Sequence, residues 1–335
     1  MEQYTKEKRI QQARGLAIVA VVIIHSGPDV AIASLIVRSA VNFCVGLFLF
    51  LSGYLTSVDK VLINPYSFCG RRILRVMIPY TIWSVIVSAV NGTLQDLPRN
   101  IITFQSLKSY YYIGVYIQLV ILTPVISWLL SRHRINGWLI MSITPISLGV
   151  MYAQILLGKR VISPWHYQWF FVWIIYYVFG MQMKLREIQN NAIKDMMILL
   201  ALFTIQILEG GLWYKYGNHF SINTAYELAC SQIKFSSLIQ TMFICWLICT
   251  YIKKEKNDKS SFWGLILKVL GDLSFGIYLI HLPVLGVVNR VCQLIGVKKT
   301  PFPLKSIIVI ILSCMFLFVI RKLTPKSFWK IVGAE

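Results

Sequence analysis

The chain has 335 residues, of which 57% are hydrophobic and only 14% are charged, and its mean hydropathy is +0.66. Soluble globular domains carry about 25% charged residues, so this composition excludes a soluble enzyme and predicts a protein that crosses a membrane many times. The net charge of +20 would favour a nucleic-acid partner in a soluble protein. Here basic residues that flank membrane spans on the cytoplasmic side explain it, and we expect no nucleic-acid partner.

Apolar runs of the length that crosses a bilayer predict an all-α bundle of ten membrane-spanning helices. The runs lie near 14–32, 38–56, 76–92, 110–130, 137–157, 168–185, 195–212, 235–252, 270–291 and 304–321. Most Lys and Arg residues fall on one side of the membrane if the N-terminus is inside, which predicts that both termini are cytoplasmic. We therefore expect a multi-pass protein of the plasma membrane.

The segments between the predicted spans are short, apart from those at 57–75, 91–109 and 213–234. We expect one integral-membrane domain over residues 1–335, whose chemistry is carried out by the bundle itself. The first run ends in Ser-Gly-Pro-Asp without a cleavage pattern, so we expect a retained span and no removed signal peptide. The seven cysteines contain no Cys-x-x-Cys pair, and we predict neither a disulfide nor a metal site.

The first apolar run carries a histidine eleven positions after an arginine. Eleven steps of about 100° come to three turns plus roughly 20°, so Arg14 and His25 share one face of a helix, about 16 Å apart along its axis. If Arg14 lies at the inner edge of the bilayer, His25 lies near the middle of it. An ionisable group at that depth is costly, so we predict that His25 faces a protein interior or a wet cavity and is a functional residue, with an interhelical hydrogen bond as the alternative.

Asp29 follows His25 by four residues, one helical turn farther along. One interpretation is that this carboxylate orients the imidazole and raises its basicity, which would make Asp29 part of the catalytic site. The other is that Asp29 is a cap or turn residue of the Ser-Gly-Pro-Asp sequence. The spacing by itself leaves both open.

Three arginines lie at the inner end of the third predicted span, in the sequence CGRRILRVMIPY. Arg71, Arg72 and Arg75 are three or four residues apart, so their guanidinium groups form one patch on a helical turn. Forked donors of this kind suit phosphate groups. The alternative is ordinary flanking charge that contacts lipid headgroups.

A further polar face is predicted in the ninth span. Tyr278 and His281 are three residues apart and share a face, which suits the lining of a cavity or an acceptor site. An interhelical hydrogen bond is the alternative for His281. Aromatic and acidic residues gather at the outer ends of other spans, which is typical of an interfacial aromatic belt, although tryptophan faces also bind sugars. They are Trp165, His166, Trp169, Glu209, Trp213 and Tyr214.

These residues together resemble the integral-membrane acyltransferase 3 family, whose members acylate carbohydrates at the cell surface. The resemblance rests on Arg14 and His25, the sequence FLFLSGYL at 48–55, and the Arg72-x-x-Arg75 element before MIPY. It also rests on YYYIGVYIQLVILTP at 110–124 and SFGIYLIH at 274–281. These motifs cover most of the chain in the family's order, and the chain looks like a short, stand-alone member that modifies surface polysaccharides.

The resemblance implies that His25 is the essential base or acyl-transfer residue, and that Arg14 with Arg72 and Arg75 serves the acyl-CoA donor. It implies an O-acetyltransferase that uses acetyl-CoA as co-substrate, without a bound cofactor, and a surface polysaccharide or lipid-linked sugar as acceptor. Direct attack of the sugar hydroxyl and a covalent acyl-histidine relay are both compatible with these residues. Two other classes stay open: a proton-coupled transporter or exporter of a glycan or glycolipid, and a membrane scaffold in polysaccharide assembly.

Overall fold

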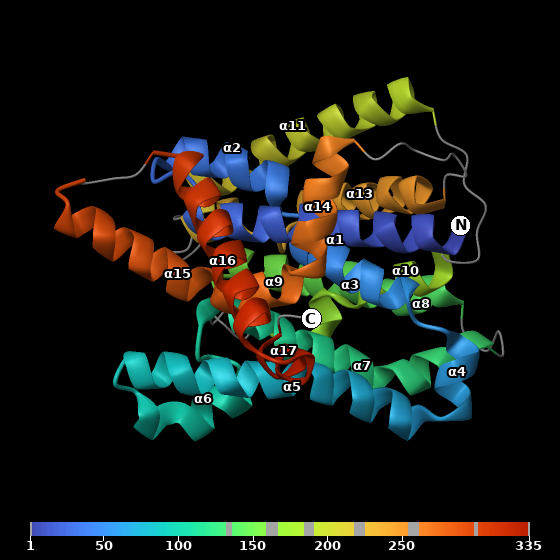
Figure 1. Cartoon of the computed structure of the whole chain (residues 1–335). Coiled ribbons are helices and arrows are strands. Elements are labelled where there is room, and N and C mark those ends of the chain that lie inside the picture. The colour runs from blue at the N-terminus through green and yellow to red at the C-terminus, as the bar shows by residue number, and fades with distance from the viewer. Residues whose placement is uncertain are drawn as a thin grey trace.

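A computed structural model describes residues 2–131, 136–158, 167–183, 191–217, 225–253, 261–297 and 301–333. These residues form helices and connecting turns, with no β-strand in any of the seven ranges. The helices pack into one layered bundle in which α1 (Glu2–Ser26) runs through the interior (Figure 1). The predicted all-α membrane bundle is confirmed.

The remaining helices follow in chain order. They are α2 (Ala31–Val41), α3 (Cys44–Tyr54), α4 (Val58–Ile63), α5 (Pro65–Val90), α6 (Leu97–Thr103), α7 (Tyr111–Ser131), α8 (Gly137–Met141), α9 (Ile143–Leu156), α10 (Ile174–Met183), α11 (Ala192–Tyr216), α12 (Ala225–Ala229), α13 (Phe235–Lys253), α14 (Phe262–Asp272), α15 (Ser274–Leu294), α16 (Leu304–Leu323) and α17 (Lys326–Val332). Short 3₁₀ turns lie at Leu94–Asp96, Lys108–Tyr110 and Phe170–Val172.

Eight helical stretches in the described part of the chain are long and apolar enough to cross a membrane. They are Ala31–Tyr54, Pro65–Val90, Leu94–Ser131, Gly137–Leu156, Ala192–Tyr216, Phe235–Lys253, Ser274–Leu294 and Leu304–Leu323. Two of the ten predicted spans fall outside this set: α1, whose first half is strongly polar, and α10, which has 10 residues. Because α1 lies in the centre of the bundle and its second half is apolar, α1 also suits a membrane span.

Glycines let pairs of helices approach closely at the centre of the bundle. A Cβ atom on Gly53 of α3 would collide with the carbonyl of Tyr177, and one on Gly180 of α10 would collide with the carbonyl of Phe50. Small residues at such crossings are typical of membrane helices, because close packing replaces the hydrophobic effect there. The Ser-Gly element of FLFLSGYL is therefore a packing device that holds α3 against α10.

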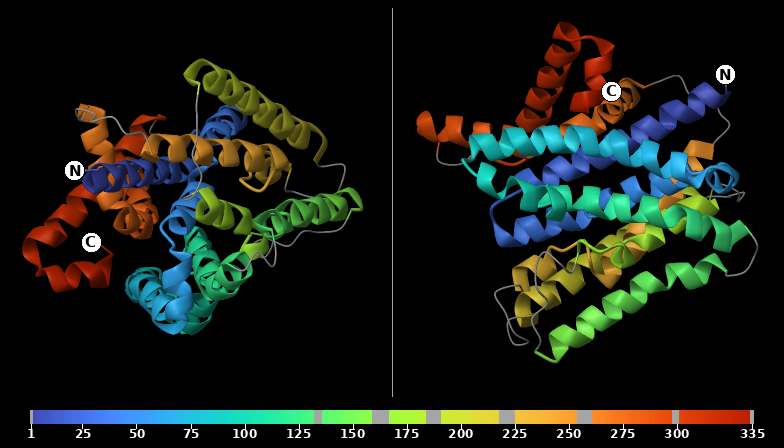
Figure 2. Two further views of the ribbon diagram at one scale, coloured as in Figure 1. Left: turned by 90° about the vertical axis from the view of Figure 1, so that its right-hand side faces the viewer. Right: turned by 90° about the horizontal axis from the view of Figure 1, so that it is seen from below.

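The segment after residue 261 lies mostly between the eighth and ninth predicted spans. It forms the amphipathic helix α14, which crosses α1 and leads directly into α15 (Figure 1). The C-terminal helices α16 and α17 lie together at one flank of the bundle (Figure 2). Both features bear on the site, because α14, α15, α16 and α17 all border the same cavity as α1.

Candidate active site

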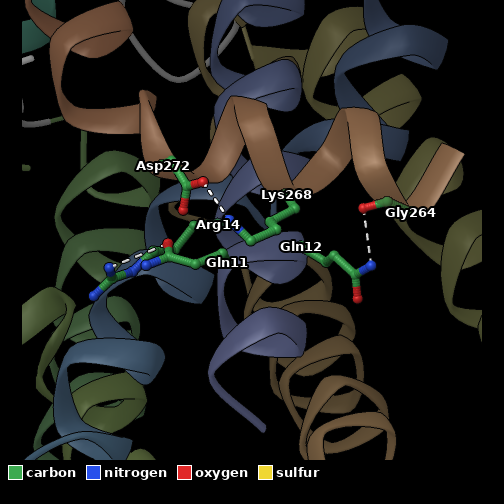
Figure 3. A network of polar contacts seen from close by, with 6 residues as sticks. All are labelled: Gln11, Gln12, Arg14, Gly264, Lys268 and Asp272. Atoms are coloured by element: carbon green, nitrogen blue, oxygen red, sulfur yellow. Dashed lines mark hydrogen bonds and ion pairs between the residues drawn. The ribbon is translucent and has the colours of Figure 1, made fainter. Parts of the chain in front are cut away.

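The crossing of α1 and α14 brings polar groups from distant parts of the chain together. A Cβ atom on Gly15 would collide with the carbonyl oxygen of Leu267, and one on Gly271 with that of Gln11, so only glycine permits this approach. Figure 3 shows the crossing from close by: the Gln12 side chain donates to the Gly264 carbonyl at 2.9 Å. The contact is therefore fixed by backbone shape as well as by hydrogen bonds.

The same crossing also carries one carboxylate, Asp272, and the arginine of α1. Asp272, at the end of α14, lies 2.7 Å from Lys268, and the Arg14 guanidinium donates to Gln11 at 3.4 Å (Figure 3). Arg14 and Asp272 both line one large cavity.

This large cavity has a volume of about 660 Å³. It is bordered by α1, α3, α5, α7, α14, α15, α16 and α17, and most of its charged lining residues are basic. Five basic side chains line it against the single carboxylate of Asp272; they are Arg14, Arg72, Arg75, Arg321 and Lys330. An excess of guanidinium groups around one hollow favours a polyanionic ligand.

Of the three arginines on α5, Arg72 and Arg75 line the large cavity and Arg71 does not. The Arg72 guanidinium lies 4.5 Å from the centre of the Phe68 ring and donates to the Ser52 carbonyl at 3.5 Å. Arg71 is exposed and its Nε donates to the Ser67 carbonyl at 3.1 Å. Of the patch predicted from the spacing, two members therefore line the cavity and one does not.

Arg321 and Lys330, which belong to the C-terminal helices, were not predicted as site residues. The Trp83 indole donates to the Val332 carbonyl at 3.2 Å and the Trp329 indole to the Thr324 carbonyl at 3.1 Å. These bonds hold α17 against α5 and α16. In the sequence the two cations look like ordinary flanking charge, and no local pattern separates them from their neighbours.

His25 does not line the large cavity. It lines a small hollow of about 20 Å³ next to it. Four residues line both spaces, namely Val21, Val45, Tyr112 and Tyr278. The Tyr112 and Tyr278 rings meet edge to face at 5.6 Å, and the Tyr278 hydroxyl donates to the Ser109 carbonyl. An apolar and aromatic neck therefore separates the cationic cavity from the histidine.

His281 does not line the large cavity; it is fully buried next to His25. The centres of the two imidazole rings are 5.2 Å apart, with an angle of 47° between their planes. The Nδ1 atom of His281 lies 2.8 Å from the carbonyl oxygen of Tyr278 and 3.2 Å from that of Ile277. Its Nε2 atom is buried and has no hydrogen-bond partner among the described residues, an arrangement that costs about 1–3 kcal/mol.

Asp29 lies apart from this group. Its side chain is half exposed and its carboxylate lies 4.0 Å from the Lys305 ammonium group. Asp29 is absent from the residues that line the large cavity and the His25 hollow. The structure thus brings together His25, His281 and Tyr278, with Arg14, Arg72 and Arg75 across the neck, and leaves Asp29 and Arg71 outside.

A further pocket, the side pocket, lies on another face of α7. It has a volume of about 260 Å³ and is lined by Ile102, Thr103, Phe104, Tyr111, Gly114, Gln118, Gln168 and Trp169. Gln118 donates to the Gln168 carbonyl at 2.9 Å and accepts from the Phe170 amide at 3.0 Å, which holds this wall in place. Tyr111 lines both the side pocket and the His25 hollow, so its ring stands between them.

Comparison with known protein families shows to which family this chain belongs. The model of the acyltransferase domain of the acyltransferase 3 family matches residues 7–322, nearly the whole chain. The chain belongs to the acyltransferase 3 family. No curated protein and no solved structure matches it.

Membership makes this chain a membrane acyltransferase and confirms the resemblance drawn from the motifs. The acyltransferase 3 match covers α1, which carries Arg14 and His25, and extends to Lys322 in α16. Of the helices that border the large cavity, only α17 lies wholly beyond the match. Acyl transfer needs an acyl donor and an acceptor, and the cavities described above are the spaces available to them.

Proposed function

We propose that the protein transfers an acetyl group from acetyl-CoA to a hydroxyl group of a cell-surface carbohydrate. The observation that supports this most directly is that the cationic cavity and the His25 hollow are neighbours, with Val21, Val45, Tyr112 and Tyr278 lining both. Coenzyme A carries three phosphate groups at one end and a slender thioester arm at the other. The phosphates suit the cationic cavity lined by Arg14, Arg72 and Arg75. The thioester arm suits the aromatic neck of Tyr112 and Tyr278, on the other side of which His25 lies.

His25 then acts as the general base. The acceptor hydroxyl oxygen attacks the thioester carbonyl carbon as His25 takes the hydroxyl proton; a C–O bond forms and the C–S bond breaks. The proton passes from His25 to the departing thiolate, which leaves as coenzyme A thiol, so the imidazole is regenerated. In a relay variant, an imidazole nitrogen attacks the thioester carbonyl first, so that a C–N bond forms and the C–S bond breaks with release of the thiolate. The hydroxyl oxygen then attacks the acyl-histidine; a C–O bond forms, the C–N bond breaks, and the hydroxyl proton passes to the thiolate, which regenerates the imidazole.

The proposal places the donor on the cytoplasmic side of the plasma membrane. Arg72 and Arg75 lie near the start of α5, and the excess of basic residues on that side follows the positive-inside pattern. Val90, at the other end of α5, is about 27 Å farther along the helix axis than Arg72, which is enough to cross most of a bilayer. The acceptor, a surface polysaccharide or a lipid-linked sugar, would therefore approach from the opposite side.

The side pocket offers a route for that acceptor. Its lining combines the aromatic rings of Phe104, Tyr111 and Trp169 with the amides of Gln118 and Gln168, and none of its lining residues is charged. Flat apolar faces and neutral hydrogen-bonding groups suit a sugar ring. Tyr111 forms a wall of both this pocket and the His25 hollow, so the two spaces are neighbours.

The deciding experiment uses the purified protein in lipid vesicles with isotopically labelled acetyl-CoA and mixed cell-envelope glycans. Label that appears in a glycan fraction only with active protein supports the proposal, and the labelled fraction identifies the acceptor. Failure of acetyl-CoA to bind would contradict it and would favour a donor with another acyl group, such as succinyl.

The C-terminal helices provide a test of the donor site with matched controls. Replacing Arg321 and Lys330 by Gln is expected to weaken coenzyme A binding about tenfold or more, because two charges facing the phosphates are lost. The control replaces Lys322 and Lys326, which are exposed and do not line the cavity, in the same way. Calorimetric titration with coenzyme A measures both; equal effects of the two double variants would contradict a local contact.

Trp169 tests the acceptor route. Its replacement by Ala is expected to raise the KM for the labelled glycan fraction about tenfold, because an aromatic contact with the sugar is lost, while the KM for acetyl-CoA stays the same. Trp138, which is more exposed and does not line the side pocket, is the control. A rise in both KM values, or a similar rise for Trp138→Ala, would argue against this route.

A further inference from the structure

The hydrogen bonds of His281 determine which of its nitrogens carries the proton. Its Nδ1 lies 2.8 Å from the Tyr278 carbonyl oxygen and 3.2 Å from the Ile277 carbonyl oxygen, one turn back on α15. Carbonyl oxygens only accept hydrogen bonds, so Nδ1 is the nitrogen that donates. In the neutral ring, Nε2 then carries a lone pair and can only accept.

The Nε2 atom of His281 is a buried hydrogen-bond acceptor without a donor among the described residues. The His281 side chain is 1% exposed, and its Nε2 is buried without a hydrogen bond in the described part of the chain. Buried acceptors in native proteins are nearly always paired, and an exception calls for a physical explanation. The ring beside it is that of His25, with the two ring centres 5.2 Å apart.

We propose that His281 is the positioning residue of His25: its Nε2 accepts the N–H of the His25 imidazole. An N–H···N bond of ordinary length joins two imidazoles whose centres are about 5 Å apart, which matches the observed separation. The rings are inclined by 47°, so the bond forms when the His25 ring turns about its side-chain bonds. Hydrogen bonds of catalytic groups often tighten in this way when substrate is bound.

The bond has a direct chemical consequence for His25. A neutral imidazole that donates from one nitrogen must present a lone pair at the other, which is the form a general base needs. His281 thus supplies the orienting acceptor that the sequence suggested for Asp29, whose half-exposed carboxylate lies beside Lys305. The catalytic meaning of the pair rests on the proposed function; the hydrogen bond itself does not.

The first test is spectroscopic and needs no acceptor. Protein labelled with ¹⁵N-histidine is reconstituted in lipid vesicles, and the His25 signals are assigned from those lost in His25→Gln. We expect His25 in a single neutral tautomer in the wild type and a mixture of tautomers in His281→Phe, which keeps an aromatic ring but has no acceptor. Unchanged His25 signals in correctly folded His281→Phe would overturn the inference.

The second test is kinetic and uses an acceptor-bearing replacement as the matched control. His281→Phe is expected to lower kcat for acetyl transfer about 10- to 100-fold while coenzyme A affinity stays within about twofold of wild type. His281→Gln, whose side-chain carbonyl can accept the same bond, is expected to recover most of the loss. Equal loss in both variants would show that His281 only fills space. If the tautomer depends on His281 but acetyl is not transferred, the pairing stands and the proposed function fails.

Discussion

Replacing His25 by Ala is expected to lower acetyl transfer by about 100- to 10,000-fold, the usual contribution of a general base. The proposed mechanism gives His25 the only proton-transfer step, from the acceptor hydroxyl to the departing thiolate. A full loss is expected for the acyl-histidine relay as well, because that variant also needs the imidazole nitrogen. The measurement is transfer of label from acetyl-CoA to glycan by the purified protein in vesicles.

The control for this prediction is donor binding by the same variant. His25 lies in its own small hollow beyond Tyr112 and Tyr278, outside the large cavity whose cations are assigned to the phosphates. Coenzyme A affinity of His25→Ala is therefore expected to stay within about twofold of wild type. Transfer at the wild-type rate in this variant would rule out the mechanism. Loss of donor binding together with transfer would point to a structural defect.

The double replacement of Arg72 and Arg75 by Gln is expected to weaken coenzyme A binding by about 100-fold or more. Each guanidinium that bonds a phosphate contributes roughly 1.5–3 kcal/mol, and both line the same cavity. Because the interaction is between charges, wild-type affinity is expected to fall as salt is raised, and the variant should show a weaker salt dependence. Titration calorimetry with coenzyme A at two salt concentrations measures both effects.

Arg71 provides a matched control for this experiment. It has the same charge and lies on the same helical turn, but it is exposed, bonds the Ser67 carbonyl and does not line the cavity. Arg71→Gln is expected to change coenzyme A affinity by less than about twofold. If it weakens binding as much as Arg72→Gln does, the whole helix turn contributes through its field, and the assignment to individual residues is wrong.

Local periodicity explains what could be predicted about the site. Arg14 and His25 lie on one helix, so their shared face follows from 3.6 residues per turn. The same holds for Tyr278 and His281 on α15. The limit of this reasoning appears on α5, where spacing groups Arg71 with Arg72 and Arg75 although only the latter two face the cavity.

Contacts between helices account for what could not be predicted. Arg321 and Lys330 lie more than 300 residues after Arg14 along the chain and line the same cavity, because α16 and α17 fold back along α5. Asp29 follows His25 closely in sequence, but the chain turns after Ser26 and leaves its carboxylate beside Lys305. Neither the position of the two C-terminal cations nor that of the Asp29 carboxylate can be predicted from the residues next to them in the sequence.

The sequence by itself determined the class of this protein. Its apolar runs require helices that satisfy their own backbone hydrogen bonds in a membrane, and its motifs place it in the acyltransferase 3 family. Only the tertiary structure decided which charges face one cavity and which histidine stands beside His25. The physical reason is that helix formation depends on neighbours along the chain, whereas a site depends on how the helices pack, here through glycine contacts such as Gly15 with Leu267.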